Sequence, residues 1–396
     1  MPIHYDAYIL KELGACATGI NDSGWIVGFT EKVPGQPVSA WWIPTVSSGQ
    51  GPQHNFIQGP AGKPAGGIDN LGDIILPNGT LFNTLFNSNP AAGPLPFATV
   101  PILSNDQVGI ALNDRQMVVS GNVIYNWLTQ EVVATMPFTD TTSYAINNLG
   151  NVVGVGFAPN QEPGYGIGAF FYTTGYDYNY GGPPGQAYFD NTVQLFDLND
   201  YGIMVGVVFG PPTTAFWQDN HAPMSGDSGG LIALPNTNEQ SLSFATAINS
   251  TGTIVGTVVG APTPQSEYAF VAPASPDLYG ASLLGEIPGF DLNSLANKPT
   301  EWSLVAANDI NNSGSIVGQA RGPGGRLAGF VANPRRTLRG LSDPPHPMSE
   351  GEVRSQIGRL TAEGAFRVQN KRSARPPLTE VQKRQRAKVL KLIGRS

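Results

Sequence analysis

Seven pairs of oxygen-bearing side chains recur along the chain, and oxygen ligands are what Ca²⁺ prefers. The pairs are Asn21-Asp22, Asp69-Asn70, Asn113-Asp114, Asn147-Asn148, Asn199-Asp200, Asn249-Ser250 and Asn311-Asn312. Ca²⁺ takes about six to eight oxygens, and each of these short loops provides few. Asn and Asp also hydrogen-bond to their own backbone and start turns. We therefore interpret the pairs as turn residues and expect no metal site.

A second motif could supply a nucleophile, because residues 226–230 read Gly-Asp-Ser-Gly-Gly. This resembles the nucleophile motif of chymotrypsin-like serine proteases, in which backbone amides beside the serine form an oxyanion hole. None of the four histidines lies in the sequence context that those proteases use: His4, His54, His221 and His346. Gly, Ser and Asp are also ordinary turn formers. We interpret Ser228 as part of a turn before a strand at 230–234 and assign no catalytic residue.

Other common chemistries lack their signatures. The single cysteine, Cys16, excludes a disulfide framework and a cysteine-based zinc site. The sequence has no glycine-rich phosphate-binding loop with a lysine, and no two histidines have the spacing of metal ligands. No run of about 18 apolar residues is present, and the N-terminus has no signal-peptide pattern. We expect no cofactor and no transmembrane segment, and the sequence leaves localisation and oligomeric state open.

The Asn/Asp pairs belong to a repeat that governs most of the chain. Each pair follows an Ile or Leu, and a β-branched run and usually a Gly come after it, as in residues 145–154, Ala-Ile-Asn-Asn-Leu-Gly-Asn-Val-Val-Gly. The Ile/Leu positions are 20, 68, 112, 146, 198, 248 and 310. Their average spacing of about 48 residues is that of a four-stranded propeller blade.

Each repeat is expected to fold as a hairpin followed by further strands. A glycine three places after the first Asn or Asp supplies the positive φ that such a turn needs, and only Gln116 departs from it. Small and aromatic residues then predict a second strand, for example Ala-Phe-Phe-Tyr at 169–172, and another apolar stretch precedes the next repeat. Four strands per repeat result.

This pattern resembles the HAF-repeat family, whose units carry Ala-x-x-Ile-Asn-x-x-Gly-x-Val-Val-Gly followed by Ala-Phe-x-Trp. The resemblance covers roughly residues 5–333, and segments 291–295 and 301–304 look like the closing unit of that family. It implies a bacterial, extracellular, propeller-like repeat protein. It implies no particular activity.

The prediction is an all-β, seven-bladed β-propeller over residues 5–334, with residues 335–396 as a separate C-terminal extension. The seventh unit lacks a fourth strand, while Tyr8, Ile9 and Leu10 precede the first unit without a blade of their own. We expect these N-terminal residues to complete the seventh blade and close the ring. An open β-solenoid is the alternative architecture.

The extension differs in charge from the predicted ring. Residues 335–396 carry 15 Lys/Arg against five Asp/Glu, whereas residues 1–334 carry seven against 24. Short helices are expected after Ser349 and Thr379. A basic cluster of Lys383, Arg384, Arg386 and Lys388 suits an anionic partner. A solvated, partly disordered tail and docking against the acidic ring are the alternatives.

An insertion between residues 172 and 189 is rich in aromatic rings. Tyr176, Tyr178, Tyr180 and Tyr188 are the candidate ligand contacts, because tyrosines offer flat amphipathic area to sugars and proteins. A connecting loop packed over its own blade is the alternative interpretation.

The function that this pattern favours is a non-catalytic binding or scaffold propeller that presents loops to a protein or glycan. The alternative is a glycosidase-like or esterase-like hydrolase whose carboxylates come from several blades. Asp177, Asp197 and Asp227 are unranked candidates for such carboxylates. An enzyme is the less favoured of the two.

Overall fold

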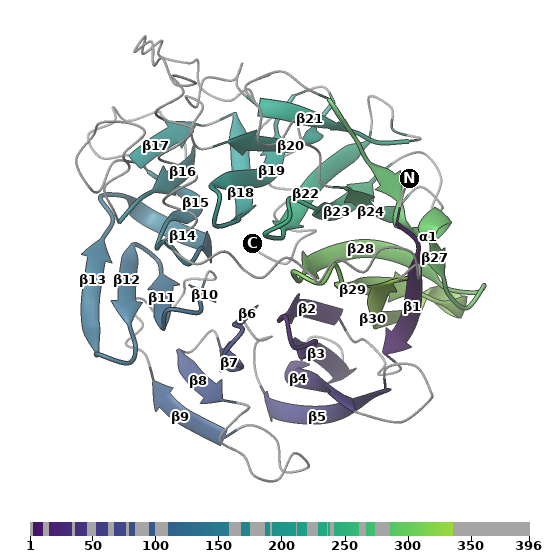
Figure 1. Cartoon of the computed structure of the whole chain (residues 1–396), viewed down its shortest axis with the longest axis horizontal. Helices are drawn as coiled ribbons and strands as arrows, with labels where there is room; N and C mark the ends of the chain where they lie inside the picture. Colours follow the sequence, from purple (N-terminus) through teal and green to yellow (C-terminus); the bar gives the residue numbers. More distant parts are fainter. Residues whose placement is uncertain are drawn as a thin grey trace.

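The computed structural model of the 396-residue chain describes the following residues: 3–10, 16–33, 36–45, 53–61, 67–76, 79–83, 95–99, 110–157, 168–174, 187–190, 192–210, 212–219, 229–235, 237, 241–260, 267–273 and 286–335. Within them the chain is almost entirely β-structure, arranged as seven sheets around a central axis (Figure 1). The predicted seven-bladed propeller is confirmed.

Each blade is an antiparallel sheet whose first strand lies nearest the axis, as Figure 1 shows. Blades one to three comprise β2 (Cys16–Ile20), β3 (Ile26–Val33), β4 (Gln36–Thr45) and β5 (Gln53–Ala61); β6 (Gly67–Ile68), β7 (Asp73–Ile75), β8 (Thr80–Asn83) and β9 (Leu95–Thr99); and β10 (Ile110–Leu112), β11 (Met117–Ser120), β12 (Val123–Asn126) and β13 (Glu131–Thr135).

The fourth, fifth and sixth blades have longer first strands. They comprise β14 (Thr139–Ile146), β15 (Val152–Phe157), β16 (Gly168–Tyr172) and β17 (Ala187–Asp190); β18 (Val193–Leu198), β19 (Ile203–Val208), β20 (Thr214–Asp219) and β21 (Gly229–Ala233); and β22 (Leu242–Ile248), β23 (Ile254–Val259), β24 (Tyr268–Ala272) and β26 (Phe290–Asp291). A two-residue strand, β25 (Ile287–Pro288), adds to the fifth blade in parallel.

The seventh blade joins the two ends of the ring. It comprises β28 (Ser303–Ile310), β29 (Ile316–Arg321), β30 (Leu327–Pro334) and β1 (Tyr5–Leu10), with β27 (Ala296–Asn297) parallel to β1. β1 pairs antiparallel with β30 over six residues, from Tyr5 opposite Pro334 to Leu10 opposite Gly329. The predicted closure of the ring by the N-terminal strand is therefore confirmed.

Two short helical turns complete the described structure. The helix α1 (Leu292–Leu295) begins after Asp291, whose side chain accepts a hydrogen bond from the Asn293 backbone N–H, and the 3₁₀ turn η4 (Pro323–Gly325) joins β29 to β30. Among the described residues, no helix is both long and apolar enough to cross a membrane.

The turn between the first two strands of each blade follows the repeat. The residue three places after the first Asn or Asp of each pair has a positive φ, between 76° and 83° for the six glycines and 59° for Gln116. Gln116 thus adopts the same left-handed conformation without the freedom of glycine.

A β-bulge recurs in the first strand of five blades. It explains why the β-branched run of the second strand ends in a glycine, because the bulged backbone leaves no room for a side chain there. Opposite Gly206, for example, the pairing shifts between Leu195 and Asp197. A Cβ added to Gly206 would lie 1.9 Å from the Gln194 carbonyl oxygen. The same close approach, at 1.9–2.4 Å, is made at Gly28, Gly154, Gly256 and Gly318.

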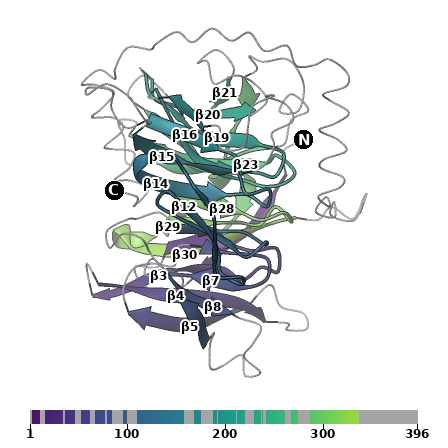
Figure 2. The same cartoon turned by 90° about the vertical axis from the view of Figure 1, so that its left-hand side faces the viewer.

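The hydrophobic core lies between neighbouring blades rather than at the axis. Among the described residues, the largest cluster joins the sixth and seventh blades and contains the fully buried Phe330 and Tyr5. The smallest joins the second and third blades and consists of buried Ile75, Leu81 and Val118 with partly buried neighbours. Side-on, the blades stack as tilted sheets (Figure 2), and each gives one apolar face to each neighbour.

Candidate functional site: the mouth of the central channel

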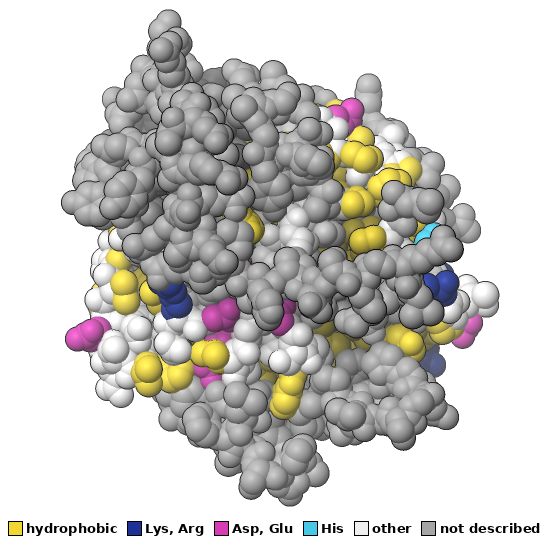
Figure 3. All heavy atoms as spheres, in the orientation of Figure 1, with side chains coloured by type: hydrophobic (Ala, Val, Ile, Leu, Met, Phe, Trp, Pro, Cys, Tyr) yellow, Lys and Arg dark blue, Asp and Glu magenta, His cyan; other side chains and the backbone are white. Residues whose placement is uncertain are grey.

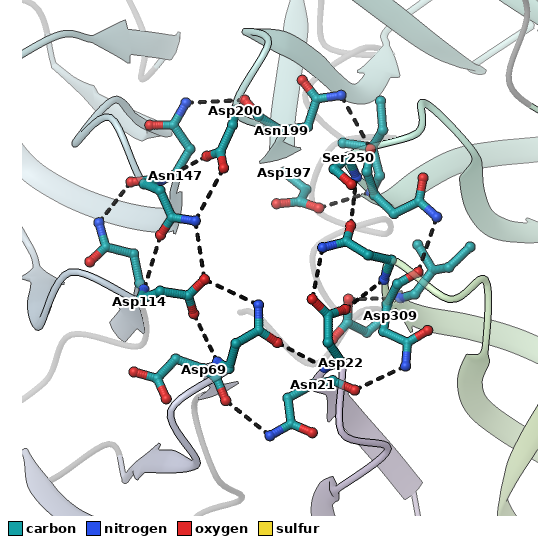
Figure 4. A pocket seen from close by; sticks show the side chains of 18 of the residues that line it. Asn21, Asp22, Asp69, Asp114, Asn147, Asp197, Asn199, Asp200, Ser250 and Asp309 are labelled. Carbon is teal, nitrogen blue, oxygen red and sulfur yellow. Dashed lines mark hydrogen bonds between the residues drawn. The ribbon is translucent and has the colours of Figure 1, made fainter. Parts of the chain in front are cut away.

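The turns that follow the first strands meet at the axis and line a polar cavity of about 220 Å³. All seven Asn/Asp pairs contribute to its wall (Figure 4). Carboxylate side chains also gather near the centre of the face seen in Figure 3. The repeat that builds the blades therefore also builds this cavity.

The first member of each pair forms a buried ring: Asn21, Asp69, Asn113, Asn147, Asn199, Asn249 and Asn311, each 4–5% exposed. Each side chain uses its Oδ1 to accept the backbone N–H four residues later, as Asn199 does from Ile203 at 3.0 Å. Each asparagine also donates from Nδ2 to the backbone carbonyl of its counterpart in the next blade. These six donor bonds are 2.7–3.2 Å long and link adjacent blades.

Asp69 is the exception in the buried ring. Its Oδ1 accepts from the Asp73 N–H at 2.8 Å, as the asparagines do four residues on, but its Oδ2 has no hydrogen-bond partner among the described residues. Burial, aided by repulsion from Asp73 and Asp114, raises the pKa of Asp69 to about 8. The carboxyl group points away from the channel centre (Figure 4).

The second member of each pair forms a mouth ring nearer the solvent: Asp22, Asn70, Asp114, Asn148, Asp200, Ser250 and Asn312. Carboxylates and amides largely alternate around it, so that the amide of Asn148 donates to both Asp114 and Asp200, each at 3.1 Å. Backbone N–H groups of one blade also donate to side chains of the next. For example, the Asp22 N–H donates to Asn70 Oδ1 at 2.8 Å. Asp22, Asp114 and Asp200 project toward the channel centre (Figure 4).

Two further carboxylates come from the ends of first strands. Asp309 accepts the Ile20 N–H at 2.8 Å, and Asp197 accepts the Ile248 N–H at 2.9 Å. Each of these bonds joins one blade to the next, so Asp197 holds two blades together. The sequence indicates Asp197 as a candidate hydrolytic carboxylate, and its Oδ2 is engaged by this backbone N–H.

The cavity wall is strongly acidic. Among the described residues that line it are six aspartates, Asp22, Asp69, Asp114, Asp197, Asp200 and Asp309, and no lysine or arginine. Burial raises the pKa of Asp200, although hydrogen bonds from Asn148 oppose the effect. The mouth therefore offers hydrogen-bond acceptors and a negative field, which favour neutral or cationic groups over anions.

Most of the predicted site residues fall outside the described residues. These are Tyr176, Tyr178 and Tyr180, Asp177 and Asp227, and the tail cluster of Lys383, Arg384, Arg386 and Lys388. Ser228, which we interpret as a turn residue, also lies outside the described residues. Tyr188 lies in β17, paired with Phe171, and nothing of its side chain is described. Their proposed contacts stay predictions.

Sequence reasoning misses the channel as a site, because it interprets the Asn/Asp pairs as turns only. Their turn role is present, since Asn21 accepts from the Trp25 N–H at 2.9 Å. The available signal is chemical. Asp and Asn both suit the turn, yet six of the seven positions are Asn, whose side chain can also donate a hydrogen bond, as an ionised Asp cannot. Across the described part of the chain, no group of three His, Cys, Asp or Glu could hold a metal ion.

Comparisons with known proteins do not assign this chain to a family. No known protein family matches the sequence, and no curated protein is similar to it. Among solved structures, Trypanosoma rangeli sialidase in complex with the inhibitor DANA has 10% identity and a TM-score of 0.26, covering 88% of this chain and 47% of that one. The chain spans about half the length of that sialidase.

A second solved structure, a complex of BT0996 and RGII, has 8% identity and a TM-score of 0.27, covering 88% of this chain and 96% of that one. At these values the matches transfer no ligand, activity or residue role to this chain. The architecture of the chain is therefore established by its own seven blades.

Proposed function

We propose that this chain is a non-catalytic binding propeller of the HAF-repeat type, and that the mouth of its central channel takes a neutral or amino-bearing group of a glycan. The observation that carries the proposal is the mouth ring, in which carboxylates are fixed by neighbouring amides and backbone N–H groups. Fixed acceptors around a polar cavity suit the hydroxyl and amine donors of a sugar, and they need little reordering when a ligand binds.

The charge of the wall narrows the ligand class. Apart from Asp69, whose pKa is raised to about 8, five aspartates line the cavity, with no basic residue among the described lining. A sialylated, sulfated or uronic-acid-rich glycan would meet like charge. The proposal therefore predicts neutral or amino sugars as ligands and excludes acidic ones at this mouth.

The test is a glycan array probed with the full chain and with Asp22→Ser and Asp114→Ser variants. Serine already occupies the mouth ring at Ser250, so the substitution retains a residue type that the ring accommodates. Loss of one charged acceptor should weaken binding by on the order of tenfold or more. Glu131→Ser, which removes an exposed carboxylate from the outermost strand β13, is the matched control and should leave affinity unchanged.

Three outcomes would overturn the proposal. These are an array without hits, preferred binding of acidic glycans, or equal binding by the mouth variants and the wild type. A protein captured in place of glycans, with its binding reduced by Asp22→Ser, would identify a protein as the partner and reject the glycan.

One observation favours the alternative of a propeller hydrolase. The amide of Asn148 donates to both Asp114 and Asp200, so these two carboxylates lie on either side of one amide. Burial also raises the pKa of Asp200. Glycosidases use such a pair as acid and base. Turnover of a glycoside that is lost in Asp200→Asn would support the hydrolase over the binding module.

A further inference from the structure

The buried ring has one junction unlike the other six. Between adjacent blades, six asparagines donate an N–H from Nδ2 to the next carbonyl. At the junction of the second and third blades the corresponding residue is Asp69. Its Oδ1 makes the same turn bond as the asparagines, which leaves Oδ2 in the place of their Nδ2 donor, and Oδ2 has no hydrogen-bond partner among the described residues. The carbonyl that should receive this bond belongs to Asn113, the next member of the ring.

The surroundings of Asp69 determine what that oxygen can do. The residue is 4% exposed, so water does not solvate the carboxyl group. An ionised carboxylate would set the lone pairs of Oδ2 against those of the Asn113 carbonyl, whereas a protonated carboxyl would place a donor there. Burying a donor–acceptor pair with its hydrogen bond made is far less costly than burying an unpaired charge.

The charged groups around Asp69 act in the same direction. Asp73 on its own blade and Asp114 on the third blade both repel an ionised Asp69. The facing residue of the first blade is the uncharged Asn21, which donates to the Asp69 carbonyl at 3.1 Å. The backbone N–H groups of Asp73 and Leu71 favour the ionised form, but burial outweighs them and the pKa of Asp69 is raised to about 8.

We infer that Asp69 is a carboxylic acid in the folded protein and closes the buried ring by donating its proton to the Asn113 carbonyl, so that the junction of the second and third blades depends on this proton. Among the described residues, this junction also has the smallest buried cluster, Ile75, Leu81 and Val118. The described first strands of these two blades are short too, since β6 spans two residues and β10 three. Within the described part of the chain, a lost bond at this junction therefore has the least packing to compensate for it.

The pH dependence follows from the two states. In the unfolded chain Asp69 ionises above about pH 4, whereas in the folded chain it keeps its proton up to a pH of about 8. Unfolding between these values releases a proton, so raising the pH favours the unfolded state about tenfold per pH unit through this one group. Above the folded pKa both states are ionised and the dependence levels off.

The experiment compares the full wild-type chain with Asp69→Asn in urea unfolding from about pH 5 to about pH 9. The variant supplies the same amide that the six other junctions use. It should lose the tenfold change per pH unit and be the more stable protein at neutral and alkaline pH. The exposed Asp140→Asn is the control and should keep the wild-type dependence.

A reciprocal variant and a direct measurement keep the inference falsifiable. Asn147→Asp places a second acid at an equivalent position, where Asn147 now donates to the Asn199 carbonyl at 3.0 Å, and should add a second tenfold change per pH unit. Carbon NMR of aspartate-labelled wild type should show a carboxyl, absent from Asp69→Asn, that titrates several units above the value of about 4 of an unfolded aspartate. A carboxyl of Asp69 that titrates near about pH 4, or an unchanged pH dependence in Asp69→Asn, would overturn the inference.

Discussion

At the scale of the residue, each asparagine of the buried ring performs two tasks with one side chain. Its oxygen fixes the turn of its own blade, and its nitrogen binds the next blade, as Asn249 does with Thr253 and Asn311. The turn could be predicted from the sequence because Asn and Asp both favour it. The inter-blade bond could not be predicted, because the partner carbonyl lies 34 to 62 residues away in five of the six bonds and 290 away where the ring closes.

Gln116 provides a residue-scale test of the turn. Its φ is 59°, in the region where the other six repeats have glycine, and a side chain there costs on the order of 1 kcal/mol. Gln116→Gly should therefore raise the free energy of unfolding by up to about 1 kcal/mol, measured by urea denaturation. The opposite change at an equivalent turn, Gly202→Gln, should lower it, and a stabilised Gly202→Gln would contradict this account.

At the scale of the element, each blade begins with a hairpin, and in five blades the first strand bulges where a glycine faces it. Small and aromatic residues are enough to predict a second strand such as that at 169–172, which is β16 (Gly168–Tyr172) in the structure. The bulge could not be predicted, since it depends on a backbone approach of 1.9–2.4 Å that sequence spacing does not show. The short parallel strands β25 and β27 were also missed, because they come from connections outside the repeat.

Gly206→Ala tests the bulge. A Cβ at this position would lie 1.9 Å from the Gln194 carbonyl oxygen and 3.0 Å from the Leu195 Cα, so the backbone must move. We expect a loss of about 3 kcal/mol in the free energy of unfolding. Gly210→Ala in the same blade is the control, because its Cβ would meet only the Pro212 oxygen at 3.7 Å; equal losses in both variants would rule out the close approach as the cause.

At the scale of the whole molecule, one strand from the start of the chain holds the ring shut. β1 supplies the outermost main strand of the seventh blade, and Tyr5 is 1% exposed within the largest core cluster of the described residues. This closure could be predicted by counting strands, since the last repeat lacked one and the N-terminus had one to spare. The ion pair between Asp6 and Arg335, at 2.8 Å, lies on the surface of the same junction.

Tyr5→Ala should lower the free energy of unfolding by about 3–5 kcal/mol, because it removes a large buried ring from the closing strand. Arg335→Ala should cost about 1 kcal/mol or less, since both partners of its ion pair are solvent-exposed. Ile3→Ala, at a side chain 46% exposed just before β1, is the control. If Arg335→Ala proved as costly as Tyr5→Ala, the closure would depend on charge rather than on packing.

The mouth ring also bears on which blades could be duplicated side by side. Read around the axis it runs Asp, Asn, Asp, Asn, Asp, Ser, Asn, and a closed circle with an odd number of places cannot alternate two residue types without one exception. Ser250 is that exception. Inserting a second copy of the fifth blade beside the first would set two aspartates next to each other, whereas inserting an adjacent pair such as the third and fourth blades would keep every carboxylate beside an amide. The order of carboxylates and amides in the mouth ring, and not only the size of the blades, therefore determines which duplications keep carboxylates apart.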